Sequence, residues 1–77
     1  MPLINVKVIE GVFSAEQKTQ IIRKLTDAMV DIEGEAMRQV TWTVIEEVKS
    51  GQWGIAGKPL STADVRALAA TRPVKVG

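Results

Sequence analysis

Two β-branched segments flank one amphipathic helical segment, and this order constrains the fold more than any other feature of the chain. Residues 2–9 alternate in polarity, which is typical of a half-buried strand with Ile4, Val6 and Val8 pointing inward. Residues 39–48 are a second segment with this character. A strand, a crossover helix and a second strand make a βαβ unit, whose two strands are parallel. The sequence therefore predicts an α/β (α+β) fold with a two-stranded parallel sheet.

The segment between the two strands carries the start and stop signals of a helix. Ser14 and Gln17 have the spacing of a capping box, in which each side chain binds the other residue's amide. Gly34 fits the end of the helix. The apolar side chains that we expect on the inner face are Ile21, Ile22, Leu25, Ala28, Met29 and Ile32, with Lys18, Arg23, Lys24 and Asp27 largely on the other side.

The remaining segments predict a hairpin and a short helix. Residues 50–59 are rich in glycine with isolated apolar side chains, which indicates a turn and a short β-hairpin. Residues 61–64, Ser-Thr-Ala-Asp, can cap a brief helix over about 62–70. Residues 71–77 have no periodicity and are predicted to be a tail. With no repeat and no linker, residues 1–77 are expected to form a single domain.

The composition excludes several classes of site and partner. The chain has no cysteine and no histidine, so disulfides, thiol nucleophiles, imidazole bases and the usual zinc ligands are absent. The net charge is +1 with both signs interspersed, which argues against a nucleic-acid partner. No apolar run approaches the roughly 20 residues of a membrane helix, and nothing at the start reads as a signal peptide. We therefore expect a cytoplasmic protein without a membrane partner.

A chain of 77 residues with 45% apolar residues needs help to be stable. A domain of this size buries only roughly 60% of its unfolded surface. A helix can cover one face of the two-stranded sheet, and the other face keeps apolar groups and open edges. Two copies side by side would form a four-stranded sheet with two helices on one face. The sequence therefore predicts a homo-oligomer, of even order.

Pro2 is the residue to which we assign the chemistry. N-terminal processing removes an initiator methionine when a small residue such as proline follows, and Pro2 would then present a free secondary amine. A terminal amine has a reference pKa near ~8, and an apolar site lowers that pKa toward neutrality. A base of that strength suits proton abstraction next to a carbonyl group. Pro2 is therefore the candidate catalytic residue.

The chain resembles the 4-oxalocrotonate tautomerase family over about residues 2–65. The resemblance is carried by Pro2 at the head of a strand, Glu10-Gly11 at its end, Glu16-Gln17-Lys18 at the helix start, Ile45-Glu46-Glu47-Val48 and Trp53-Gly54-Ile55-Ala56-Gly57. It implies a β-α-β tautomerase fold with a C-terminal hairpin, built from dimers into a homohexamer, a trimer of dimers. It also implies proton transfer by the proline between enol and keto forms of 2-oxo acids, with no metal or organic cofactor.

The residue-by-residue resemblance is mixed. Trp53 matches the family's aromatic residue that lines the apolar pocket. The family's two arginines for a dicarboxylate substrate do not match, because this chain has Val12-Phe13 after the Glu-Gly pair and Trp42 in the second strand. Trp42 would make the pocket more apolar or simply pack, and we expect Phe13 to pack on the first helical turns. Arg38 is the best remaining candidate to hold a substrate carboxylate, although it is also placed as an ordinary surface arginine.

The function that these observations predict is a cofactor-independent tautomerase acting on a small-molecule carboxylate, a 2-oxo acid or a 2-hydroxydienoate. One alternative is a proline-based hydratase, decarboxylase or dehalogenase of unsaturated acids. That chemistry generally needs an added carboxylate to activate water, and Glu46 or Glu47 would qualify only if one points into the pocket with a raised pKa. The two residues are adjacent in a strand and face opposite sides, so they cannot form a facing carboxylate dyad. The other alternative is a non-catalytic oligomeric binding module.

Overall fold

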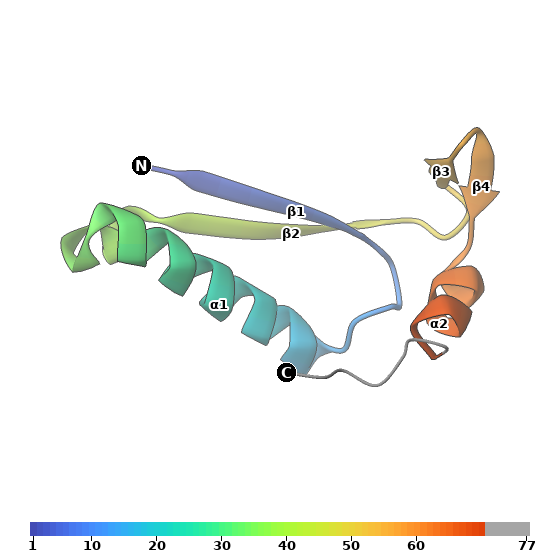
Figure 1. Ribbon diagram of the computed structural model, residues 1–77, viewed down its shortest axis with the longest axis horizontal. Coiled ribbons are helices and arrows are strands. Elements are labelled where there is room, and N and C mark those ends of the chain that lie inside the picture. The colour runs from blue at the N-terminus through green and yellow to red at the C-terminus, as the bar shows by residue number, and fades with distance from the viewer. Residues whose placement is uncertain (71–77) are drawn as a thin grey trace.

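The computed structural model describes residues 1–70, and Figure 1 shows its elements in order. They are β1 (Leu3–Ile9), α1 (Ala15–Glu33), the 3₁₀ helix η1 (Glu35–Val40), β2 (Trp42–Val48), β3 (Trp53–Ile55), β4 (Lys58–Leu60) and α2 (Thr62–Ala70). The tail predicted for residues 71–77 lies outside the described residues.

The strands β1 and β2 pair in parallel, from Leu3 opposite Trp42 to Ile9 opposite Val48. The helix α1 lies along one face of this sheet (Figure 1). The strands β3 and β4 pair antiparallel as a separate hairpin beyond the end of β2, and α2 follows the hairpin. The predicted β-α-β fold with a C-terminal hairpin is therefore confirmed.

The predicted signals at both ends of α1 are present. The Gln17 amide donates to the Ser14 hydroxyl at 3.1 Å, and the Ser14 amide donates to the Gln17 side-chain oxygen at 2.9 Å. At the other end, the Gly34 amide donates to the Val30 carbonyl at 2.8 Å. Gly34 has a φ of 106°, which glycine adopts without a Cβ penalty. The chain therefore leaves α1 where the sequence predicts.

The inner face of α1 is rotated from the predicted one. Val30, which the predicted stripe omits, is only 4% exposed, whereas Ile32 is 85% exposed. Lys18, predicted on the outer side, is half-buried and pairs with Glu47 at 3.1 Å. The Thr26 and Thr43 hydroxyls lie 2.9 Å apart and join α1 to β2. Ile21, Leu25 and Met29 are half-buried as predicted, while Ile22 and Ala28 are exposed.

The second strand is shorter than predicted. It begins at Trp42 rather than at residue 39, because Glu35–Val40 turns as a 3₁₀ helix. The Met37 amide donates to the Gly34 carbonyl at 3.1 Å, and the Thr41 hydroxyl donates to the Met37 carbonyl at 2.8 Å. These local bonds pair backbone N–H and C=O groups between α1 and β2, where the chain has no neighbouring strand to bond with.

Little of the described chain is fully buried. Of residues 1–70, only Ile9 and Val30 have hydrophobic side chains below a tenth exposed. The face of the sheet away from α1 carries Leu3, Trp42 and Val44, which are all exposed. Side-by-side pairing of two copies would leave this apolar face open, so it would be covered when one such dimer packs against another. No helix within residues 1–70 is long and apolar enough to cross a membrane.

Candidate active site

Pro2 lies at the head of β1 and is held through its carbonyl group. The Trp42 amide donates to the Pro2 carbonyl at 3.0 Å, which is the first link between the two strands. The Pro2 residue is half-buried, while Met1 is 75% exposed and precedes the paired strand. Removal of Met1 would therefore leave the β1–β2 pairing intact and place the Pro2 nitrogen at an open end of the sheet.

Trp42 lies beside Pro2 in the sheet but its side chain is on the uncovered face. It is opposite Leu3 in the register and 57% exposed, with Leu3 itself 61% exposed. Two large apolar side chains thus stand together next to Pro2 and away from α1. Such a pair is suited to burial against another copy or against an apolar substrate.

Arg38 is engaged by the chain's own carboxylates. Its Nη1 donates to Asp27 at 2.7 Å, and its Nε and Nη2 donate to the two carboxylate oxygens of Glu35 at 2.7 and 3.3 Å. The Glu35 bonds, followed by the Asp27 bond, raise the pKa of Arg38 above its ordinary value. A substrate carboxylate would have to displace one of these partners, so the structure gives Arg38 a local pairing role instead of an open binding group.

Trp53 lines an apolar hollow at the other end of the chain. The hollow has a volume of about 270 Å³ and lies between the end of β1, the β3–β4 hairpin and α2. It is lined by Ile9, Val12, Phe13, Trp53, Leu60, Val65 and Leu68. Every one of these side chains is apolar.

The structure does not bring Pro2 and Trp53 together within one chain. Pro2 is bonded to Trp42 at the start of β2, and Trp53 follows the end of β2 at Val48. Six strand steps of about 3.3 Å separate those two ends by about 20 Å. Figure 1 shows the N-terminus and the hairpin at opposite ends of the sheet. A site containing both residues needs two copies of the chain.

Glu46 and Glu47 are on opposite faces of β2, as predicted. Glu46 accepts from the side chains of Asn5 and Lys7, and these bonds lower its pKa. Glu47 accepts from Lys18 at 3.1 Å and from the Gly11 amide at 3.4 Å, and these bonds also lower its pKa. A water-activating base needs a raised pKa instead, so neither residue favours the hydratase or dehalogenase alternative.

Arg66 is a candidate that the sequence reasoning missed. Its Nε and Nη2 both donate to the Gly11 carbonyl, the former at 3.0 Å. The contact joins α2 to the loop after β1, across 55 positions of sequence. A bond to a backbone carbonyl so far away has no pattern in the sequence. The only local signal is the capped helix over residues 62–70 that carries Arg66.

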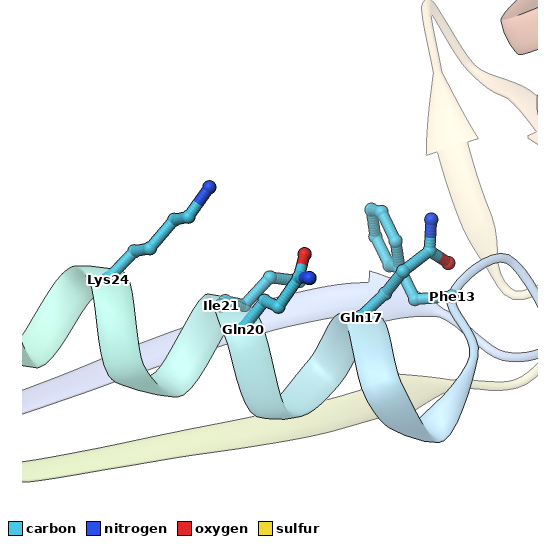
Figure 2. A pocket seen from close by; sticks show the side chains of 5 residues that line it. All are labelled: Phe13, Gln17, Gln20, Ile21 and Lys24. Atoms are coloured by element: carbon cyan, nitrogen blue, oxygen red, sulfur yellow. The ribbon is translucent and has the colours of Figure 1, made fainter.

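A second hollow of about 210 Å³ lies along the first turns of α1 and is lined by Phe13, Gln17, Gln20, Ile21 and Lys24. Figure 2 shows the Phe13 ring beside Gln17, and the Lys24 amine extended away from the helix. Phe13 thus packs on the first helical turns, as predicted. Phe13 also lines the hollow that contains Trp53.

Comparison with known proteins gives concordant matches. A family model described as tautomerase enzyme matches residues 2–63. A probable tautomerase of Staphylococcus aureus strain Mu50 is 44% identical over 57 residues, which are 74% of this chain and 90% of the relative. A probable tautomerase of Ralstonia nicotianae is 44% identical over 63 residues, 82% of this chain and 87% of the relative.

A solved structure extends the match to three dimensions. It is a putative 4-oxalocrotonate tautomerase from methicillin-resistant S. aureus, with a TM-score of 0.65 and 38% sequence identity. The alignment covers 82% of this chain and 95% of that one. The family match ends at the first turn of α2, so Arg66 lies beyond it.

Proposed function

The chain belongs to the tautomerase family of isomerases, and from this premise we propose that it interconverts enol and keto forms of a 2-oxo acid or 2-hydroxydienoate. Pro2, exposed by removal of Met1, is the proposed base and acid, and no cofactor takes part. We further propose that the protein is cytoplasmic and works as a homohexamer, a trimer of dimers.

The observation that carries this proposal is how Pro2 is held. The hydrogen bond from Trp42 uses the Pro2 carbonyl, so the nitrogen has no role in the β1–β2 ladder. A mature chain would therefore present a secondary amine fixed in direction by the strand behind it. Leu3 and Trp42 provide apolar surface beside it, and such a surface disfavours a charged amine once water is excluded from it.

The second wall of the site comes, in this proposal, from a neighbouring copy. Trp53 and its apolar hollow are about 20 Å from Pro2 along the sheet. The tryptophan that excludes water from the Pro2 amine therefore belongs to another copy of the chain. Association is favoured because it buries the exposed apolar face formed by Leu3, Trp42 and Val44. Association then builds the active site and completes the apolar core together.

The proposed proton transfer conserves all atoms. Neutral Pro2 takes the proton of the substrate's 2-hydroxyl group or of a carbon next to its carbonyl. The electron pair left behind delocalises over the enolate or dienolate. The protonated amine then returns a proton to a different carbon, which gives the isomeric oxo acid and regenerates the neutral amine.

The test is a pH–rate profile of ketonisation, followed in the ultraviolet, for untagged protein whose intact mass shows loss of Met1. Phenylenolpyruvate and 2-hydroxymuconate serve as a monoacid and a diacid. We expect the rate to rise with one deprotonation, and Pro2→Ala to lower kcat/KM by roughly 10²-fold or more. Equal rates for Pro2→Ala and wild type in a folded oligomer would overturn the proposal.

A further inference from the structure

We propose that Arg66 binds the substrate carboxylate, in place of the arginines that are absent at Val12 and Trp42, and selects acids with one carboxylate and an apolar tail. This inference rests on the proposed function, because it names the substrate class of that site. It concerns a residue in α2, beyond the part of the chain that matches the family model.

The guanidinium of Arg66 is oriented with part of its binding capacity unused. Arginine has five N–H donors in a fixed plane. Nε and one Nη2 hydrogen are directed at the Gly11 carbonyl, which fixes that edge of the group. The edge formed by Nη1 and the other Nη2 hydrogen remains, and two parallel N–H donors are the geometry that grips a carboxylate at both oxygens.

The positive charge of Arg66 is also uncompensated within the described chain. The Gly11 carbonyl is neutral, and no carboxylate of residues 1–70 forms an ion pair with Arg66. Arg38 differs in this respect, since Asp27 and Glu35 both pair with it. Of these two arginines, Arg66 is therefore the one that has no carboxylate partner among residues 1–70 and can bind an anion without displacing one.

Hydrogen bonds hold α2 in place beneath Arg66. The Thr62 hydroxyl donates to the Glu10 carbonyl at 2.6 Å, and the Thr62 amide donates to the Ser50 hydroxyl at 2.9 Å. Ser61 and Asp64 bond each other's amides at 3.0 and 3.1 Å, as a capping box does. The start of α2 is thus tied to the ends of both β1 and β2, which fixes Arg66 before a ligand binds.

The surface beside Arg66 defines the rest of the substrate. Its neighbour Val65 and Gly11's neighbour Val12 both line the apolar hollow that contains Trp53. A hollow of about 270 Å³ with only apolar lining suits an aromatic ring or a short aliphatic chain. A second carboxylate placed against this lining would lose its hydration without a partner, which is costly. A single cation bonded to the Gly11 carbonyl, next to Val12 of the hollow, thus favours a monoacid.

The test measures binding of an acid that does not react. Isothermal titration calorimetry compares cinnamate with its neutral isostere cinnamamide on the untagged full chain. The variants are Arg66→Gln, Arg66→Lys and, as a charge-matched control on the exposed side of α1, Arg23→Gln. We expect Arg66→Gln to weaken cinnamate binding about 10- to 100-fold and to leave cinnamamide unchanged. Arg66→Lys keeps the charge without the fork and should fall between, while Arg23→Gln should match wild type.

The outcomes separate this inference from the proposed function. Cinnamate binding that is absent in wild type, or equal in Arg66→Gln and Arg23→Gln, overturns the role of Arg66 even if ketonisation proceeds. Arg66-dependent cinnamate binding without ketonisation supports Arg66 and rejects the tautomerase chemistry. If sedimentation shows that Arg66→Gln does not assemble, the Arg66→Lys variant provides the test. A cinnamate affinity equal to wild type in Arg66→Lys would then count against a two-point grip by the guanidinium.

Discussion

The backbone amide of Trp42 donates to the carbonyl of Pro2 at 3.0 Å, so the proposed base lies at the start of β2 and not at its end. Because β1 and β2 are parallel, the chain leaves β2 at the far end of the sheet from Pro2, where the β3–β4 hairpin follows (Figure 1). Trp53 lies in this hairpin. One chain therefore keeps its candidate base, Pro2, apart from the apolar hollow that contains Trp53, and a site with both residues takes them from two copies.

Two inactive variants should restore activity when they assemble together. Pro2→Ala chains keep Trp53, and Trp53→Ala chains keep Pro2. If each site takes its two residues from different copies, random assembly of an equal mixture leaves roughly a quarter of the sites with both residues intact. We expect ketonisation near that fraction of wild type after the two variants are unfolded, mixed and refolded.

The matched control refolds each variant alone and combines them only afterwards, at a temperature where subunits do not exchange. That sample should show no more than the sum of the separate activities. A co-refolded mixture with equally low activity would mean that both residues act within one chain, or that Trp53 has no part in the site.

An added residue before Pro2 should abolish activity without unfolding the protein. In a chain that keeps Met1 or an N-terminal tag, the Pro2 nitrogen is an amide and accepts no proton. Met1 is 75% exposed and outside the β1–β2 pairing, so the extension has room. We expect a fall in kcat/KM of roughly 10²-fold or more relative to the same tag at the C-terminus. Intact mass and sedimentation would check processing and assembly, and an active tagged chain with a blocked nitrogen would contradict the mechanism.

The fold was predictable where the determining interactions are local. The Ser14–Gln17 capping box and the Gly34 stop lie within a few residues of the backbone that they fix. The rotation of α1 depends instead on a contact across the fold, the hydroxyl pair of Thr26 and Thr43. The periodicity of apolar residues carries no information about that contact. A prediction from periodicity alone therefore placed Ile32 on the inner face.

The candidate site was predictable only in its residue types. Pro2 and Trp53 are visible in the sequence, but their separation follows from the parallel pairing of β1 with β2 and the placement of the hairpin. The carboxylates around Arg38 come from α1 and η1, and their convergence depends on the turn between them. Arg66 contacts a backbone carbonyl, which every residue has, so no sequence pattern marks its partner.

A charge on the uncovered sheet face should dissociate the assembly. Trp42 is 57% exposed in one chain and stands opposite Leu3, so Trp42→Glu would bury an unpaired carboxylate in any interface on this face. We expect the dissociation constant to rise about 30-fold or more. Sedimentation velocity over a concentration series measures this, with Arg23→Glu on the outer side of α1 as the control. Identical profiles for the two variants would place the interface elsewhere.

Protonation of Glu47 should weaken the fold in acid, because the carboxylate joins three elements. It pairs with Lys18 of α1 at 3.1 Å and accepts from the Gly11 amide at 3.4 Å, and the Lys18 bond is the larger cause of its lowered pKa. A carboxyl group whose pKa is lower folded than unfolded stabilises the fold above the unfolded value, near 4.5. That contribution disappears as the pH falls through the lower, folded value. Chemical unfolding at fixed protomer concentration from pH 7 to pH 3 should therefore show a smaller loss of stability for Glu47→Gln than for wild type, whereas Asp31→Asn, at an exposed position of α1, should follow wild type. A Glu47→Gln curve parallel to wild type across this range would show that the Lys18 pairing adds nothing to the acid sensitivity of the fold.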